Sequence, residues 1–180
     1  MTDHSALRTP HSAFGVSLAQ RCRPVELLVL DVDGVLTDGA IVYGSGALEV
    51  KAFHVRDGSG LKLWHAAGKR SAILTGRSSS LVEVRASELG VGWVIQGAAD
   101  KAAALDLLLA RGPLSAEAVC YVGDDVPDVP VLRRVGLAVA VADACPAARA
   151  AAHYVTSAPG GRGAVRETIE RILRCQGLWS

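Results

Sequence analysis

Short apolar runs alternate with longer stretches of helical periodicity along most of the chain. The runs are aliphatic and have the length of buried parallel strands; they lie at 27–31, 71–74, 92–95, 118–122, 137–141 and 153–155. Between them, apolar spacing predicts helices at 57–67, 80–89 and 100–111, each followed by a glycine, which adopts a left-handed backbone without steric cost. This alternation predicts an α/β fold: a doubly wound (Rossmann-like) parallel sheet with helices on both faces.

Three segments fall outside this alternation. Residues 40–43 and 47–53, around Gly44-Ser45-Gly46, predict a hairpin at about 40–53. Because an isolated hairpin is marginal in water, we expect it to pack on its own sheet or on another subunit. The tail 158–163 is expected to be a flexible loop before a closing helix at 164–175. Residues 1–24 form a lead-in, with a short helix near 16–22, ahead of a single domain at 25–180.

Composition excludes several classes of function. The 180 residues are 50% hydrophobic with a net charge of +1, and they contain no basic stripe interleaved with aromatics, so no nucleic-acid partner is expected. Nowhere do about 18 apolar residues run together, so no membrane span is expected. Residues 1–26 contain no apolar run typical of a secretory signal. The four cysteines are far apart and lack zinc-ligand spacing, which favours a reduced, cytoplasmic protein.

Two acidic clusters each follow a predicted strand. Asp31-Val32-Asp33-Gly34 follows the first strand, and Gly123-Asp124-Asp125-Val126-Pro127-Asp128 follows the fourth. The carboxyl ends of parallel strands meet at the edge where ligands bind, so we expect the clusters to converge. Taken alone, the first cluster is equally well a solvated Asp-Gly turn. Three acids within five residues of the second exceed what a helix cap needs, and together the clusters suit Mg²⁺ and a phosphate group.

Further signals complete a phosphate site. Asp31 and Asp33 provide the two carboxylates that covalent phosphoryl transfer requires, one as nucleophile and one as general acid and base. Thr75 follows the second strand and supplies a hydroxyl at the same edge. Lys101 opens the helix after the third strand, although the helix dipole disfavours a cation there. Four matched signals, each after a different strand, predict a phosphate-handling enzyme.

These motifs resemble those of the haloacid dehalogenase superfamily of phosphatases. The segment 31–39, Phe53-His54-Val55-Arg56-Asp57-Gly58, Thr75-Gly76-Arg77 and the tail 160–167 resemble more closely the 3-deoxy-D-manno-octulosonate 8-phosphate phosphatase family, over roughly 26–175. The resemblance implies a capless fold with an inserted hairpin. It also implies a homotetramer in which the hairpins assemble centrally and a neighbour helps to close the site.

The resemblance implies a role for each motif residue. Asp31 would be the nucleophile and a magnesium ligand, Asp33 the general acid and base with its backbone carbonyl on the metal, and Asp124 a further metal ligand. Thr75 and Lys101 would hold the phosphoryl oxygens. Substrate contacts would come from Asp33, His54, Val55, Arg56, Asp57, Gly58, Lys62, Arg77, Arg85, Lys101, Asp125 and Arg162, the last reaching an adjoining subunit. The chain departs from the family at His54, where Asn is usual, and at Lys62, where Arg is usual.

The function expected from this resemblance is Mg²⁺-dependent hydrolysis of 3-deoxy-D-manno-octulosonate 8-phosphate through an aspartyl-phosphate, in lipopolysaccharide precursor biosynthesis. Two alternatives stay open. Nonulosonate (sialic-acid-type) 9-phosphate phosphatases share much of the pattern. A non-catalytic oligomerisation module is a hypothesis of another class, but such a module has no need of Asp31, Asp33, Lys101 and Asp124 together.

Overall fold

A six-stranded parallel sheet forms the centre of the computed structural model, which describes residues 16–179 without the side chain of Ala47. The strands, in spatial order, are β5 (Trp93–Ile95), β4 (Arg70–Leu74), β1 (Leu27–Leu30), β6 (Val119–Gly123), β7 (Leu137–Ala140) and β8 (Tyr154–Val155). Every neighbouring pair is parallel. The six predicted strands and the doubly wound fold are confirmed. The predicted absence of a secretory signal rests largely on residues 1–15, outside the described range.

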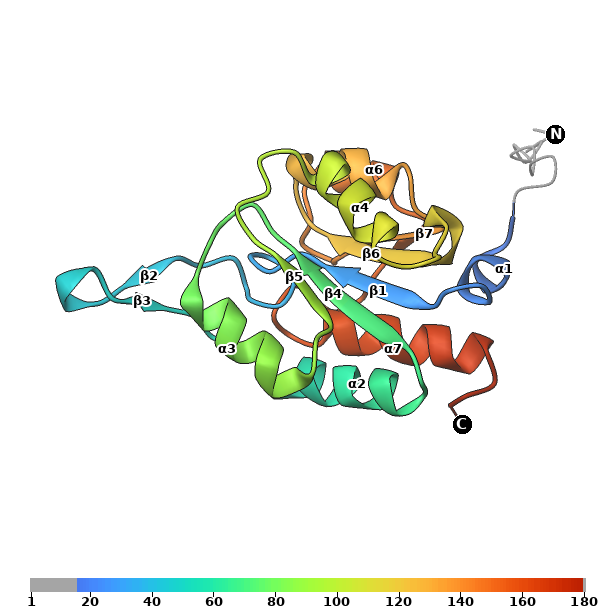
Figure 1. The fold of residues 1–180 in the computed structure, drawn as a ribbon, viewed down its shortest axis with the longest axis horizontal. Helices are drawn as coiled ribbons and strands as arrows, with labels where there is room; N and C mark the ends of the chain where they lie inside the picture. The colour runs from blue at the N-terminus through green and yellow to red at the C-terminus, as the bar shows by residue number, and fades with distance from the viewer. Residues whose placement is uncertain (1–15, 180) are drawn as a thin grey trace, which may run out of the picture.

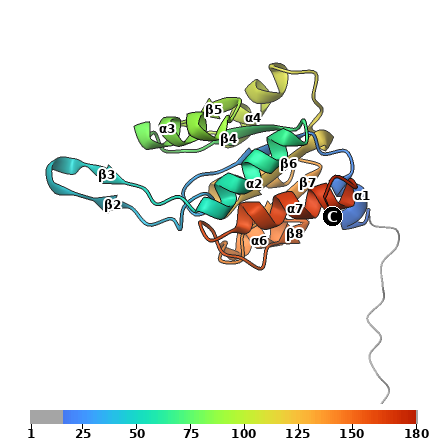
Figure 2. The same cartoon turned by 90° about the horizontal axis from the view of Figure 1, so that it is seen from below.

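Helices cover both faces of the sheet. On one face lie α2 (Val55–Ala66), α3 (Ser80–Leu89) and α7 (Ala164–Cys175), and on the other lie α4 (Lys101–Ala110), α5 (Val129–Leu132) and α6 (Pro146–Ala151). Figure 2, seen from below, shows α2 and α7 side by side in front of the sheet, and they pack against each other. A short α1 (Leu18–Cys22) packs on α7. Three 3-10 turns lie at Ser45–Ala47, Ala116–Ala118 and Val126–Asp128.

The core lies between these layers. All four residues of β1 and all five of β6 are buried, as expected for central strands covered on both faces. In α7, Val165, Ile169 and Ile172 are 0% exposed and recur at helical spacing on the face that meets α2 and the sheet. The longest helices, α2 and α7, have 12 residues, and no helix within residues 16–179 is long and apolar enough to cross a membrane.

The predicted hairpin is confirmed, but its strands are shorter than predicted. β2 (Val42–Tyr43) and β3 (Glu49–Val50) pair antiparallel and project from the body of the molecule, as both views show (Figures 1 and 2). The apolar side chains of Val42, Leu48 and Val50 are 50%, 70% and 52% exposed. Within this chain, the hairpin therefore leaves an apolar surface in contact with solvent.

The tail 158–163 is not the flexible loop that its composition predicts. Gly160 donates its N–H to Asp143 Oδ1 at 2.9 Å, and Gly161 donates its N–H to the carbonyl of Val35 at the same distance. A Cβ built on Gly160 would lie 1.7 Å from the carbonyl oxygen of Gly34. Glycine is needed there because two backbones pass in direct contact, and the tail is thereby packed against the loop after β1.

Strand order places a switch point next to β1. From β1 the chain moves outward to β4 and β5, then crosses to β6 on the other side of β1. In open α/β sheets, ligands bind outside the carboxyl ends of the strands at such a point. The loops after β1 and β6 are therefore the expected position of the site.

Candidate active site

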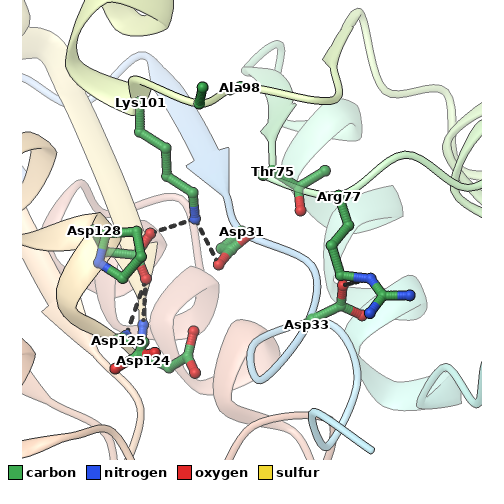
Figure 3. Close-up of a pocket in the computed structure, with 12 residues that line it drawn as sticks. Asp31, Asp33, Thr75, Arg77, Ala98, Lys101, Asp124, Asp125 and Asp128 are labelled. Carbon is green, nitrogen blue, oxygen red and sulfur yellow. Dashed lines mark hydrogen bonds and ion pairs between the residues drawn. The ribbon is translucent and has the colours of Figure 1, made fainter. Parts of the chain in front are cut away.

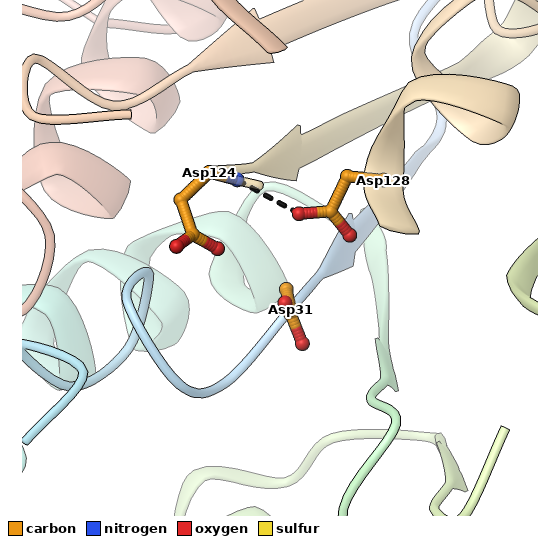
Figure 4. A group of neighbouring side chains, drawn as sticks. All are labelled: Asp31, Asp124 and Asp128. Atoms are coloured by element: carbon orange, nitrogen blue, oxygen red, sulfur yellow. Dashed lines mark hydrogen bonds between the residues drawn. The ribbon is translucent and has the colours of Figure 1, made fainter. Parts of the chain in front are cut away.

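The two acidic clusters meet at this switch point, as predicted. Asp31 follows β1 and Asp124 follows β6, the strand paired with β1. Asp31, Asp124 and Asp128 each present a carboxylate oxygen, and these oxygens lie within 4.8 Å of one another. Figure 4 shows the three side chains grouped beyond the strand ends. One divalent cation can contact oxygens at this separation, because its ligands lie roughly 2.0–2.6 Å from the ion.

The acids line a pocket of about 380 Å³. Its lining includes these predicted site residues: Asp31, Asp33, Thr75, Arg77, Lys101, Asp124 and Asp125. In Figure 3, Lys101 reaches between Asp31 and Asp128, whereas Thr75 and Arg77 approach from another side. The four signals that follow four different strands in the sequence therefore occupy one pocket.

Lys101, the first residue of α4, is buried between two carboxylates. Its Nζ lies 2.7 Å from Asp31 Oδ2 and 2.6 Å from Asp128 Oδ1. Burial acts to lower the pKa of Lys101, but attraction from Asp31 and Asp128 outweighs burial and raises that pKa overall. The two carboxylates thus compensate for a helix N-terminus that disfavours a cation. The ammonium stays charged at the pocket wall, where a bound phosphate needs positive charge.

Asp128 organises the second cluster. It is 0% exposed, and its Oδ1 accepts hydrogen bonds from Lys101 Nζ and the Tyr121 hydroxyl, each at 2.6 Å. Its Oδ2 accepts the backbone N–H groups of Asp124 at 2.8 Å and Asp125 at 3.1 Å. Both oxygens are therefore occupied. No sequence motif indicates a role for Tyr121. A tyrosine in a buried strand nevertheless needs a partner for its hydroxyl, and that requirement could have linked Tyr121 to the acids that follow.

Asp31 and Asp124 offer carboxylate oxygens that fit a divalent cation as ligands. Burial raises the pKa of Asp31 to about 6, with Asp128 adding to the shift and Lys101 opposing it. Burial, together with the charges of Asp31 and Asp128, raises the pKa of Asp124 to about 7. Asp124 Oδ1 is buried and has no hydrogen-bond partner within residues 16–179. A buried carboxylate oxygen without a donor is costly, and a hard cation such as Mg²⁺ satisfies it.

Gly34 lets the first cluster approach the second. Its φ is 89°, a left-handed backbone that favours glycine, and a Cβ built there would lie 2.2 Å from Asp124 Oδ2. A side chain at this position would displace the Asp124 carboxylate. The Asp-x-Asp-Gly order of the first cluster therefore has a steric reason in addition to its chemistry.

Asp33 lines the pocket but stands apart from the group of three acids. Its carboxylate pairs with Lys51, and Asp33 Oδ2 lies 3.6 Å from Arg77 Nε. Figure 3 shows Arg77 beside Asp33. Lys51 directly follows β3 of the hairpin and belongs to none of the motifs recognised in the sequence. A lysine after a short strand carries no local signal of its partner, because the pairing depends on how the hairpin is placed.

Other predicted substrate residues line a second, smaller pocket or lie beside it. Val55, Gly58, Lys62 and Arg85 take part in lining a pocket of about 220 Å³ near the start of α2. His54 caps that helix, since its Nδ1 accepts the backbone N–H of Arg56 at 3.3 Å. The Arg56 side chain is exposed. These residues lie together, but they do not line the pocket that contains Asp31.

Two further residues that were predicted to contact substrate form hydrogen bonds or ion pairs within the chain. Asp57 is 1% exposed and accepts the N–H groups of Gly163 at 3.1 Å and Arg166 at 2.8 Å, so its carboxylate caps the start of α7. Asp57 therefore has a structural role at the start of α7, and its contact with substrate stays a prediction. Arg162 Nη2 lies 3.3 Å from Asp38 Oδ2, and the Arg162 side chain is 63% exposed. Its reach into a neighbour stays a prediction.

Comparison with known proteins agrees with this geometry. A family model of haloacid dehalogenase-like hydrolases matches residues 73–166. The 3-deoxy-D-manno-octulosonate 8-phosphate phosphatase KdsC of Yersinia pestis is 44% identical over 176 residues, which cover 98% of this chain and 94% of that protein.

Solved structures agree as well. A probable YrbI family phosphatase from Pseudomonas syringae has a TM-score of 0.88 and 48% identity, covering 89% of this chain and 92% of that one. The 3-deoxy-D-manno-octulosonate 8-phosphate phosphatase of Moraxella catarrhalis, in complex with magnesium, phosphate and KDO, has a TM-score of 0.87 and 43% identity, covering 88% of this chain and 91% of that one. The chain therefore belongs to the haloacid dehalogenase-like hydrolases and, within them, to the 3-deoxy-D-manno-octulosonate 8-phosphate phosphatase family.

Proposed function

We propose that this protein is a Mg²⁺-dependent phosphatase that hydrolyses 3-deoxy-D-manno-octulosonate 8-phosphate to the free sugar acid and inorganic phosphate, a step in lipopolysaccharide precursor biosynthesis. The observation that carries the proposal is the meeting of Asp31, Asp124 and Lys101 in one pocket. It occurs in a chain 44% identical to a phosphatase of that name.

Asp31 and Asp124 would hold Mg²⁺ with their carboxylates, and Asp33 would contribute its backbone carbonyl. When bound, the ion would neutralise negative charge on the phosphoryl group and hold it against Asp31. The protein residues supply the remaining positive charge and donors. Lys101 Nζ, already 2.7 Å from Asp31 Oδ2, would contact a phosphoryl oxygen beside the nucleophile. Thr75, which lines the same pocket, would donate its hydroxyl to another.

In the first step, a carboxylate oxygen of Asp31 attacks phosphorus and the ester P–O bond breaks. Asp33 gives its proton to the leaving sugar oxygen, which departs as an alcohol. Asp31 Oδ1 accepts the backbone N–H of Val32 at 2.7 Å, and Oδ2 pairs with Lys101. Each oxygen of the nucleophilic carboxylate is therefore held by its own partner. Both phosphorus and the leaving oxygen must lie in the pocket that Asp31 and Asp33 share.

In the second step, the Asp33 carboxylate takes a proton from water, whose oxygen bonds to phosphorus. The bond between phosphorus and Asp31 breaks, and inorganic phosphate leaves. Asp31 regains its carboxylate, and Asp33 again carries the proton that the next cycle requires. The chemistry needs one acid that stays bonded and one that exchanges protons, which agrees with the separate positions of Asp31 and Asp33 in the pocket.

The sugar acid would bind between Arg77, Asp125 and the start of α2. Arg77 and Asp125 line the catalytic pocket, and Lys62 and Arg85 line the second pocket with Val55 and Gly58. Arginine forks suit a carboxylate, and Arg85 Nε is buried without a hydrogen-bond partner within the described part of the chain. His54 and Arg56 would approach the hydroxyl groups of the same substrate.

We also propose a homotetramer assembled through the hairpins, with Arg162 completing a neighbour's site, and a cytoplasmic location. The exposed apolar residues Val42, Leu48 and Val50 support assembly, because a projecting two-stranded hairpin gains little stability by itself. The four cysteines are all free thiols, which suits a reducing compartment. Cell fractionation with an antibody to the chain tests the location.

The experiment that tests the proposed function measures phosphate release from 3-deoxy-D-manno-octulosonate 8-phosphate, a nonulosonate 9-phosphate and a neutral hexose phosphate. We expect kcat/KM to favour the eight-carbon acid by about tenfold or more, and we expect activity to disappear with a chelator. Asp31→Asn should release no phosphate while unfolding at a similar temperature. Asp106→Asn, at an exposed ion pair with Arg134, is the matched control and should keep full activity.

Two results would change the assignment. A higher kcat/KM for the nine-carbon phosphate would make the protein a sialic-acid-type phosphatase. No turnover of any ester in the presence of Mg²⁺ would reject catalysis and leave the oligomerisation module.

A further inference from the structure

Lys51 is a buried cation on an otherwise exposed hairpin. Its side chain is 3% exposed, and its ammonium pairs with Asp33 Oδ1. The Asp33 side chain is 20% exposed, and its other oxygen lies 3.6 Å from Arg77 Nε. Each oxygen of the general acid and base thus has its own cationic partner.

Glu49 connects these two cations. Its Oε1 lies 3.5 Å from Lys51 Nζ and 3.0 Å from Arg77 Nη2. Alternate residues of a strand point to opposite faces, so Glu49 and Lys51 share the face that meets the pocket while Val50, 52% exposed, points away. The hairpin therefore presents a fixed pair of charges to the active site.

Two simpler roles for Lys51 fit the structure less well. A solvated surface lysine would not bury its side chain against two carboxylates. A direct phosphate ligand should line the catalytic pocket, and Lys51 is not among the residues that line it. Its contacts run to Asp33 and Glu49, so any effect on the reaction passes through Asp33.

We propose that Lys51 is a positioning residue that holds the ionised carboxylate of Asp33 for the water-attack step. The proposal rests on the phosphatase activity proposed above but not on which sugar acid is hydrolysed. After the first step Asp33 has lost its proton, and a carboxylate attracts the ammonium of Lys51 more strongly than a neutral acid does. Asp33 is then fixed while it removes a proton from the water that attacks phosphorus and releases Asp31.

The test separates the two chemical steps by pre-steady-state kinetics with p-nitrophenyl phosphate. This ester needs little proton donation, because its leaving group is stable as an anion. The burst of nitrophenolate measures transfer to Asp31, and the following linear phase measures breakdown of the phospho-enzyme. For Lys51→Met we expect a burst rate within about threefold of wild type and a breakdown rate reduced by about tenfold or more, which is part of the roughly 10²–10⁴-fold that a positioned proton-transfer group contributes.

Matched variants make this result specific. Lys51→Arg should restore most of the breakdown rate. Glu49→Gln should slow the same step to a smaller extent and serves as the second test if Lys51→Met does not fold. Lys69→Met is the control, because Lys69 also pairs with a carboxylate, Glu26 Oε1 at 2.7 Å, but lies outside the catalytic pocket.

The outcomes are distinct. Equal slowing of both steps, slowing of the burst alone, or unchanged kinetics in Lys51→Met and Glu49→Gln would overturn the positioning role. Failure of the proposed function would differ, because wild-type protein would then hydrolyse neither p-nitrophenyl phosphate nor a sugar-acid phosphate.

Discussion

The carboxylates of Asp31 and Asp124 are stabilised in the protonated form until a cation binds. Their pKa values, about 6 and about 7, lie above the value of 3.8 for an unperturbed aspartate. Between about pH 4 and about pH 7, the folded chain therefore holds protons on these carboxylates that the unfolded chain has released. The free energy of unfolding of the metal-free protein therefore receives a contribution from these groups that is fully present below about pH 4 and is lost as pH rises to about 7.

This titration predicts a pH-dependent difference between wild type and Asp124→Asn. Measured in chelator, the melting temperature of wild type should fall relative to that of Asp124→Asn as pH rises from about 4 to about 7, at roughly 2–4 °C per kcal/mol. Mg²⁺ should stabilise wild type more at pH 7 than at pH 5, because it competes with protons. A constant difference between the two proteins across this range would contradict the assigned cause.

Individual residues differed in how well the sequence predicted them. Asp31, Thr75, Lys101 and Asp124 each follow a recognisable strand, so a local pattern with the parallel-sheet rule placed them at one edge. Lys51 had no such pattern, because its contact with Asp33 depends on how a short hairpin folds back.

Asp57 is the opposite case, because it lies in a recognisable motif but its partners in the structure were not predicted. Its motif predicts a substrate contact, and the sequence did not indicate that both carboxylate oxygens accept N–H groups at the start of α7, far along the chain. Motif resemblance names the residue type at a position and does not reveal which neighbour a side chain meets.

At the scale of elements, the loop after β1 depends on close backbone contacts. Gly34 combines a φ of 89° with a Cβ position 2.2 Å from Asp124 Oδ2. Gly68, just after α2, has a φ of 76° but open space around its Cβ position. Substituting each glycine therefore distinguishes the effect of backbone strain, present at both positions, from displacement of a metal ligand, expected only at Gly34.

We predict that Gly34→Ala and Gly68→Ala each lower the free energy of unfolding by about 1–2 kcal/mol, because alanine is strained in a left-handed backbone. The total loss should be larger for Gly34→Ala. Only Gly34→Ala should weaken Mg²⁺ binding, by roughly 10–100-fold, as changes around metal ligands do. Urea unfolding and calorimetric titration with Mg²⁺ measure the two effects. Similar Mg²⁺ affinities in both variants would show that Gly34 does not position Asp124.

Element types were easier to predict than element ends. Ser80 begins a sequence typical of a capping box, yet Ser79 is the residue whose side chain caps α3, accepting the N–H of Leu81 at 3.3 Å. Gly90 caps the C-terminus of α3 in the left-handed conformation as predicted, whereas α4 ends at Ala110 and its C-cap is the right-handed Arg111, before Gly112. The alanine-rich α6 was missed because six residues contain too little periodicity to indicate a helix.

At the scale of the whole molecule, the alternation of strands and helices was sufficient to predict the parallel sheet, since crossovers in such folds follow one hand. The position of the hairpin relative to the sheet was beyond prediction, because no repeat or pairing rule relates it to β1. Packing within one chain does not account for the exposed apolar face of the hairpin.

The proposed tetramer predicts that Val42→Lys and Leu48→Lys, alone or together, reduce the mass in solution from four chains toward one. Burying two charges in an apolar contact opposes association. Leu107→Lys is the control, because Leu107 is 64% exposed on α4, away from the hairpin. Light scattering coupled to size-exclusion chromatography measures the mass. An unchanged tetramer in both hairpin variants, or a monomeric wild type, would reject assembly through this surface.

Transfer of the phosphoryl group to Asp31 is tested most directly by trapping the acyl phosphate. Asp33→Asn should slow its hydrolysis, so the variant is mixed with p-nitrophenyl phosphate, whose leaving group needs little proton donation, quenched in acid, reduced with borohydride and digested for mass spectrometry. Reduction converts a phosphorylated aspartate to homoserine, and we predict this change at position 31, in the peptide that begins the loop after β1. Homoserine at any other aspartate, or at none while phosphate is still released, would contradict the covalent role of Asp31.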